Sequence, residues 1–116
     1  MSGKLTTHVL DTSIGAPAKG IQIDLKQLDD VSRGWIQLGS SRTNGDGRLN
    51  EPLLKGVSMQ QGTYELTFHA GDYYSGTENP GFLDLIPVRF VIHDNEAHYH
   101  VPLLLSPGGY TTYRGS

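Results

Sequence analysis

Cysteine is absent from the 116 residues of this chain, and its absence excludes a disulfide framework and a thiolate metal site. Long apolar runs are missing as well, since none approaches the roughly 18 residues that a membrane helix needs. Residues 1–4 carry no apolar segment of a secretory leader, and the chain does not end in Ser-Lys-Leu. These absences predict a cytoplasmic protein with no membrane partner.

Positive charge is also scarce. Lys and Arg number 9 against 12 for Asp and Glu, which gives a net charge of −3. No basic block is present, so nucleic acid is not expected as a partner. No internal repeat or linker divides the 116 residues, which suffice for a hydrophobic core. We therefore expect a single domain over residues 1–116.

Turn residues and alternating strands are what the chain does contain. Its 15 glycines and 6 prolines are scattered, which favours tight turns over long helices. Ile21, Ile23 and Leu25 alternate with polar residues, as in a half-buried antiparallel strand. Comparable patterns predict strands over 5–11, 35–43, 62–70, 87–93, 98–106 and 110–114, a short one from 48, and one short helix over 72–77. The expected fold class is all-β, a two-sheet β-sandwich of about eight strands.

The segments 5–11 and 98–106 have apolar residues on both faces. In the first segment Leu10 and Val9 point to opposite faces of the strand, and in the second Leu104 and Leu103 do the same. Each sheet of a two-layer sandwich has one outer face, so apolar residues there indicate a covering partner. The pattern predicts an oligomer whose covered face includes His8, His98, His100 and Arg48. Pro102 removes one ladder donor from its strand and predicts a local bulge.

Histidine supplies the most distinctive chemistry. His69 and His93 lie at predicted strand ends and read as surface or satisfied residues, whereas His8 and His100 interrupt faces that continue apolar. A histidine pair suits proton transfer near neutral pH, one ring accepting a proton from water while the other donates to a leaving nitrogen. Arg48 follows the tight-turn sequence 44–47 and offers a fork of donors for an anionic or carbonyl oxygen.

Other assignments of the same residues compete with this one. Tyr113 shares a strand face with Thr111 and is a candidate lining residue, and Ser116 offers a hydroxyl and the terminal carboxylate. A zinc site built on His98, His100 and His8 lacks any supporting motif. A serine esterase is less favoured still, because no G-x-S-x-G sequence is present.

Four stretches together resemble the 5-hydroxyisourate hydrolase family, the transthyretin-related proteins of purine catabolism. They are residues 5–11, residues 43–48, residues 98–107 and the terminal Tyr-Arg-Gly-Ser of 113–116. Transthyretin itself, the hormone carrier, has lysine in place of His8, glutamate in place of Arg48 and threonine in place of His100, and lacks that ending. These differences place the chain on the hydrolase side of the resemblance.

The resemblance implies a transthyretin-like homotetramer with active sites in a channel between dimers. It implies hydrolysis of 5-hydroxyisourate to 2-oxo-4-hydroxy-4-carboxy-5-ureidoimidazoline on the route from urate to S-allantoin, with no cofactor and no metal. His8 and His100 become the acid/base pair, Arg48 the holder of substrate oxygen, and Tyr113 and Ser116 substrate-binding residues. The resemblance leaves open which histidine activates water, and His98 is expected at the rim. A non-catalytic carrier of small aromatic ligands is the main alternative, followed by a metal-binding or adhesive sandwich.

Overall fold

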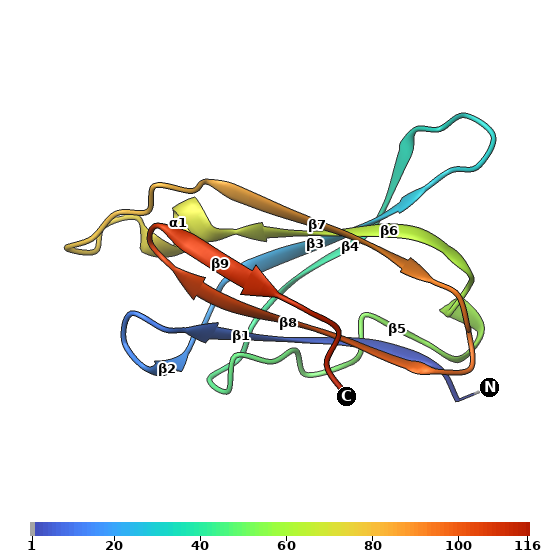
Figure 1. Cartoon of the computed structure of the whole chain (residues 1–116), viewed down its shortest axis with the longest axis horizontal. Coiled ribbons are helices and arrows are strands. Elements are labelled where there is room, and N and C mark those ends of the chain that lie inside the picture. The colour runs from blue at the N-terminus through green and yellow to red at the C-terminus, as the bar shows by residue number, and fades with distance from the viewer. Residues whose placement is uncertain (1) are drawn as a thin grey trace.

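A computed structural model describes residues 2–116, and most of the regular structure is strand (Figure 1). The strands are β1 (Lys4–Asp11), β2 (Ala16–Pro17), β3 (Gln22–Leu28), β4 (Trp35–Arg42), β5 (Leu54–Lys55), β6 (Gly62–His69), β7 (Leu85–Ile92), β8 (His98–Ser106) and β9 (Gly109–Thr112). The helical elements are α1 (Ala70–Tyr74) and a 3₁₀ turn (Gly56–Ser58). Within residues 2–116, no helix is long and apolar enough to cross a membrane.

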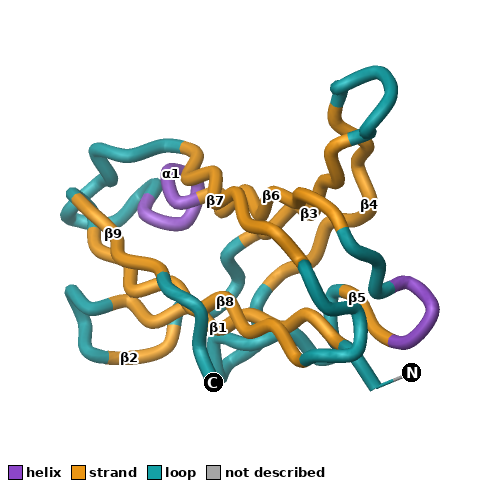
Figure 2. The backbone as a smooth tube through the Cα atoms, turned by 45° about the vertical axis from the view of Figure 1, so that its right-hand side comes forward, coloured by secondary structure: helices purple, strands orange, loops and turns teal. Residues whose placement is uncertain are grey.

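The strands form two sheets that pack face to face. The first has the order β2-β1-β8-β9, with β5 also paired to β1, and the second has the order β4-β3-β6-β7. In Figure 2, β1 and β8 of the first sheet lie below β3 and β6 of the second. The predicted two-sheet sandwich with one short helix is confirmed, although the helix begins at Ala70, two residues before its predicted start.

The apolar residues that alternate along the strands meet between the sheets. The central core members, each at most 2% exposed, are Leu5, Val9, Leu103 and Leu105 of the first sheet and Ile23, Leu25, Leu66 and Phe68 of the second. Burial of one such side chain stabilises the fold by about 1.5–3 kcal/mol. Because strand side chains alternate, these inward residues turn Thr6, His8, His98 and His100 to the outer face of the first sheet.

At the centre of the first sheet, the N-terminal strand β1 lies beside the late strand β8. β1 and β8 run parallel, in an unbroken register from Lys4 opposite His98 to Asp11 opposite Leu105. A parallel pair needs a long crossover connection, and here the chain builds the whole second sheet between the two strands. The register sets Thr6 beside His100 and His8 beside Pro102.

The strand predicted from residue 48 does not form. Arg48 makes a single antiparallel bridge with His8, and the next strand along the chain is β5 (Leu54–Lys55). Pro52 interrupts the intervening segment, since proline has no N–H to donate to a ladder. Arg48 is therefore held beside β1 by a turn and one bridge.

The bulge predicted at Pro102 is also wrong. Leu103 pairs with Thr112, and His100 bridges Gly115 in the same register, so the ladder between β8 and the C-terminal segment lapses over Pro102 and then resumes. A proline can occupy such a gap without any shift in register, because no donor is required there.

Candidate active site

The turn over residues 44–47 places Arg48 next to β1. The Asn44 side-chain oxygen accepts the Arg48 N–H at 3.2 Å, and the Gly47 carbonyl accepts the Val9 N–H at 2.8 Å. Gly47 has φ +74°, and a Cβ there would lie 2.4 Å from the Val9 carbonyl oxygen. Only glycine fits both the backbone conformation and the close approach. The turn docks on β1 and leaves Arg48 bridged to His8.

The same turn fixes the tautomer of His8. Its Nε2 lies 3.0 Å from the Asp46 carbonyl oxygen. A carbonyl oxygen only accepts hydrogen bonds, so Nε2 carries the hydrogen. In the neutral ring Nδ1 is then the nitrogen with the free lone pair. Nδ1 is thus the nitrogen of neutral His8 that can accept a proton.

His98 and His100 converge on one hydroxyl group. The Thr6 Oγ1 atom lies 2.7 Å from His98 Nε2 and 2.8 Å from His100 Nδ1. The two ring centroids are 6.1 Å apart. Among residues 2–116, no buried side-chain nitrogen or oxygen lacks a hydrogen-bond partner. The other ring nitrogen of His100, Nε2, has no hydrogen-bond partner within residues 2–116. It is therefore not a buried atom, and solvent can reach it.

The electrostatic surroundings keep both rings neutral. Burial, followed by the charge of Arg48 and then the other two histidines, lowers the pKa of His100 below its ordinary 6.5. Burial, then Lys4 and Arg114, lowers the pKa of His98. Desolvation and nearby positive charge both disfavour the imidazolium. Near neutral pH, His100 is therefore an uncharged imidazole able to donate or accept a proton.

A pocket of about 380 Å³ opens over this cluster. That volume falls in the range of small-molecule sites, about 300–1,000 Å³. Its chemically active lining consists of Lys4, Thr6, Arg48, Glu51, His98, His100 and Ser116. The concentration of ionisable groups around one opening makes it the candidate active site.

The C-terminal segment is fastened to β8 and brings Ser116 to this pocket. The Gly115 N–H donates to the His100 carbonyl at 2.8 Å, and a Cβ on Gly115 would lie 2.6 Å from His100 Cδ2. Arg114 donates to the His98 carbonyl at 3.2 Å, with its guanidinium carbon 4.1 Å from the Tyr99 ring centroid. A glycine and a stacked arginine thus hold the chain end in place.

The sequence-predicted residues are only partly brought together. Arg48, His100 and Ser116 line one pocket. His8 is not among the lining residues of that pocket and is connected to it by its backbone bridge with Arg48. Tyr113 lies elsewhere: it is 56% exposed and lines a separate cleft beside β7. Its substrate-binding role stays a prediction.

Thr6 is the residue that sequence reasoning missed. Its position two residues before His8 on the same strand face was a usable signal. Its contact with His98 and His100 depends on the β1–β8 register, which no local pattern specifies. The predicted zinc alternative finds no geometric support in residues 2–116, where no three His, Cys, Asp or Glu side chains are grouped to hold a metal ion.

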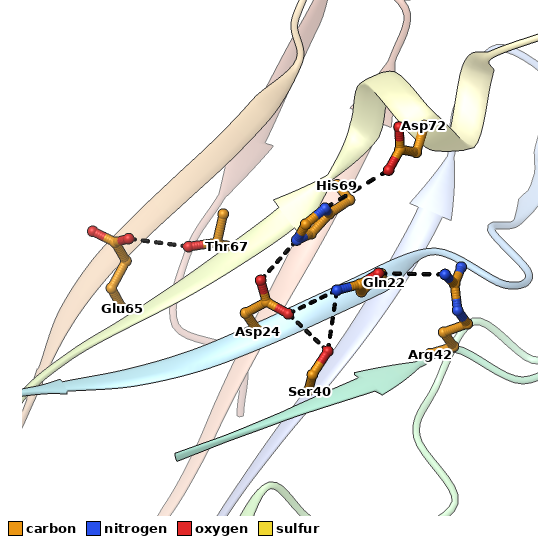
Figure 3. A network of polar contacts seen from close by, with 8 residues as sticks. All are labelled: Gln22, Asp24, Ser40, Arg42, Glu65, Thr67, His69 and Asp72. Carbon is orange, nitrogen blue, oxygen red and sulfur yellow. Dashed lines mark hydrogen bonds and ion pairs between the residues drawn. The ribbon is translucent and has the colours of Figure 1, made fainter. Parts of the chain in front are cut away.

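A second polar network lies on the outer face of the other sheet (Figure 3). His69 Nε2 is 2.7 Å from Asp24 Oδ2, and His69 Nδ1 is 3.9 Å from Asp72. The other Asp24 oxygen accepts from Ser40 at 2.8 Å and from Gln22 at 3.1 Å. The partners in this network satisfy one another across β3, β4 and β6, as expected of a structural network.

Comparison with known proteins agrees with this geometry. A family model described as HIUase/Transthyretin matches residues 5–115. The chain belongs to the HIUase/Transthyretin family. A relative named 5-hydroxyisourate hydrolase 2 from Rhizobium meliloti is 55% identical over 119 residues, covering 99% of this chain and 98% of that protein.

Solved structures of the HIUase/Transthyretin family share the fold. The 5-hydroxyisourate hydrolase of Klebsiella pneumoniae superposes with a TM-score of 0.82 at 33% identity, covering 100% of both chains. Transthyretin from Sparus aurata superposes with a TM-score of 0.89 at 27% identity, covering 97% of this chain and 96% of that one. Hydrolase and transthyretin share this fold, so the fold alone does not distinguish hydrolysis from ligand transport. The distinction has to rest on the side chains of the site.

Proposed function

We propose that this protein hydrolyses 5-hydroxyisourate to 2-oxo-4-hydroxy-4-carboxy-5-ureidoimidazoline. The observation that carries the proposal is the pocket in which an uncharged His100, Arg48 and the chain end at Ser116 meet beside His8. These groups match the needs of cyclic amide hydrolysis: a proton acceptor, a proton donor and a cation for developing oxygen charge. The relatives named 5-hydroxyisourate hydrolase support the same substrate.

In the proposed reaction, water adds to the carbonyl carbon of the six-membered ring. The Nδ1 atom of His8 takes a proton from the water, since its Nε2 is already bound to the Asp46 carbonyl. The Arg48 guanidinium donates to the carbonyl oxygen as negative charge grows on it. When the carbon–nitrogen bond of the ring breaks, the Nε2–H of His100 protonates the departing nitrogen. His8 then releases its proton to solvent, and His100 regains one proton from solvent, so that both rings return to their starting neutral state.

The decay of freshly made 5-hydroxyisourate tests this proposal. Urate oxidase generates the compound from urate, and its ultraviolet absorbance falls as the ring opens. The expected result is a decay rate that rises in proportion to the concentration of this protein. A carrier, the alternative that the transthyretin fold suggests, would bind small aromatic ligands with no change in that rate.

We also propose that four copies assemble, with the outer face of the first sheet covered. Leu10 and Leu104 are paired in the β1–β8 ladder on that face and are only half-buried in a single chain. Apolar residues on an outer face favour a covering partner. Light scattering on the eluting protein is expected to give the mass of a tetramer, and a monomer would refute this assembly.

A further inference from the structure

The Thr6 hydroxyl lies between two imidazoles that come from β8. It is 2.7 Å from one ring nitrogen of His98 and 2.8 Å from one ring nitrogen of His100. Both distances are those of good hydrogen bonds. The link therefore joins an exposed ring, His98, to a half-buried ring that faces the pocket, His100.

A hydroxyl group has one hydrogen to donate, so the two contacts of Thr6 are not alike. When Thr6 donates to His100 Nδ1, it accepts the Nε2–H of His98, and the hydrogen of neutral His100 is on Nε2. When Thr6 donates to His98 Nε2, it accepts the Nδ1–H of His100, and His100 Nε2 holds a lone pair. The arrangement couples the tautomers of the two rings through one oxygen.

The neighbouring threonine makes a useful contrast. Thr7 is 2% exposed, and its hydroxyl donates to the Val101 carbonyl at 2.7 Å. A carbonyl cannot pass a proton onward, so this bond only stabilises the β1–β8 pair. The Thr6 hydroxyl instead contacts two imidazole nitrogens, and each of them can donate or accept a hydrogen according to the tautomer of its ring.

We propose that Thr6 and His98 form a proton relay that supplies His100 from solvent. The relay rests on the proposed hydrolase function, because it serves the step in which the leaving nitrogen is protonated. Thr6 and His98 act through His100 and are positioning residues.

Each step of the relay balances. His100 gives its Nε2 hydrogen to the leaving nitrogen and takes the Thr6 hydrogen on Nδ1. Thr6 takes the Nε2 hydrogen of His98, and His98 takes a proton from solvent on Nδ1. All three groups are uncharged before and after, with both tautomers reversed. The reverse shift resets the relay, with one proton entering at His100 Nε2 and one leaving from His98 Nδ1.

The charges around the relay favour this neutral transfer. Lys4 of β1 and Arg114 of the C-terminal segment act on His98, while Arg48 and His8 act on His100. Glu51 and Ser116 line the same pocket. Since the groups that act directly on the two rings are cations and imidazoles, a lasting positive charge on either ring is disfavoured.

Kinetics on three variants test the relay. Thr6→Val removes the hydroxyl and keeps the shape, so kcat for 5-hydroxyisourate is expected to fall by about 10–100-fold with little change in KM. Thr6→Ser restores the hydroxyl and is expected to recover most of kcat. Thr7→Val is the matched control, with a lower unfolding temperature but near-normal kcat. Full kcat in Thr6→Val, or a Thr6→Ser as slow as Thr6→Val, overturns the relay.

Nitrogen NMR of the histidine rings tests the coupling without any substrate. When Thr6 is present, the His98→Gln substitution is expected to change the tautomer populations of His100. In a protein that already carries Thr6→Val, His98→Gln is expected to leave the His100 tautomer populations unaltered. Coupling in a protein that does not hydrolyse 5-hydroxyisourate would refute the proposed function and keep the tautomer link. Absence of coupling refutes the relay whatever the activity.

Discussion

Histidine is used in opposite ways on the two sheets of this molecule. On the second sheet, His69 lies 2.7 Å from the Asp24 carboxylate and faces Asp72 from the other side (Figure 3). On the first sheet, His100 contacts the Thr6 hydroxyl and lies under the influence of Arg48. His69 is thus partnered by carboxylates, whereas His100 is partnered by a hydroxyl and a nearby cation that favours its neutral form.

The pKa directions express the same contrast. Burial alone would raise the pKa of Asp24, but hydrogen bonds from His69, Gln22 and Ser40 outweigh it and lower the pKa. Burial and the Arg48 charge instead lower the pKa of His100. A carboxylate partner thus makes a histidine part of a stabilising pair, whereas a cation and a hydroxyl keep one ready for proton transfer.

Removal of the proton acceptor is expected to have the largest effect. His8→Ala eliminates the Nδ1 lone pair and is expected to lower kcat for 5-hydroxyisourate by at least about 100-fold. Initial rates from the ultraviolet decay measure this, and circular dichroism checks that the fold is kept. A folded His8→Ala protein with the wild-type rate would remove His8 from the mechanism.

Removal of the cation tests the other half of the contrast. Arg48→Gln is expected to lower kcat/KM by about 10–100-fold, because the carbonyl oxygen loses a charged donor. It also removes one cause of the lowered His100 pKa, so the pKa of His100 in an NMR titration of the ring nitrogens is expected to rise. An unchanged pKa would show that Arg48 does not act on His100.

Disruption of the network around Asp24 and His69 is expected to change stability but not activity. Asp24→Asn is expected to reduce the free energy of unfolding by about 1–2 kcal/mol near neutral pH, with the rate per folded molecule unchanged. The folded-state pKa of Asp24 lies below its unfolded value of 3.8. Its stabilisation is therefore present above that value and is lost as pH falls through the lower, folded pKa.

Urea unfolding of the wild type and Asp24→Asn at several pH values measures this loss. The difference between the two proteins is expected to narrow as the pH drops below about 4. A difference in unfolding free energy that stays constant over that pH range would show that the Asp24 charge does not contribute to stability.

The titration of the His100 ring is a smaller effect. Because burial and Arg48 lower the pKa of His100 below 6.5 in the folded protein, the ring is expected to stay neutral down to that lowered value. An NMR pH titration of the ring nitrogens is therefore expected to give a His100 pKa below 6.5. A pKa above 6.5 would contradict the neutral state on which the proposed steps depend.

Metal removal is expected to have no effect. Dialysis against a chelator is predicted to leave the decay rate of 5-hydroxyisourate unchanged, because the proposed steps use imidazole and guanidinium groups only. Loss of the rate, with recovery on adding zinc, would favour the zinc alternative instead.

The fold was predictable where alternation decided it. The strict pattern over 20–28 and the apolar stripe of 98–106 gave the inner faces, since a one-residue shift would expose the core. Arg48 was predicted to open a strand, but a tight turn and Pro52 leave it only one bridge. Helix α1 overlaps the predicted helix but is displaced toward β6.

The site was predictable in its residue types but not in its connections. His100 and Arg48 could be named because they interrupt or follow recognisable patterns, and both line the pocket. Thr6 could not, because its role comes from pairing with a strand more than 90 residues away. Tyr113 points to the same limit: its placement follows from where β9 ends, at Thr112.

A matched pair of histidine variants tests the central contrast most directly. The initial decay rate of 5-hydroxyisourate is measured for the wild type, His100→Gln and His69→Gln under identical conditions. His100→Gln is predicted to lose at least about 100-fold in kcat while remaining folded, and His69→Gln to keep its rate while unfolding more easily. Equal rates in the two variants, or a loss confined to His69→Gln, would contradict the assignment of the pocket around Arg48 and His100 as the active site.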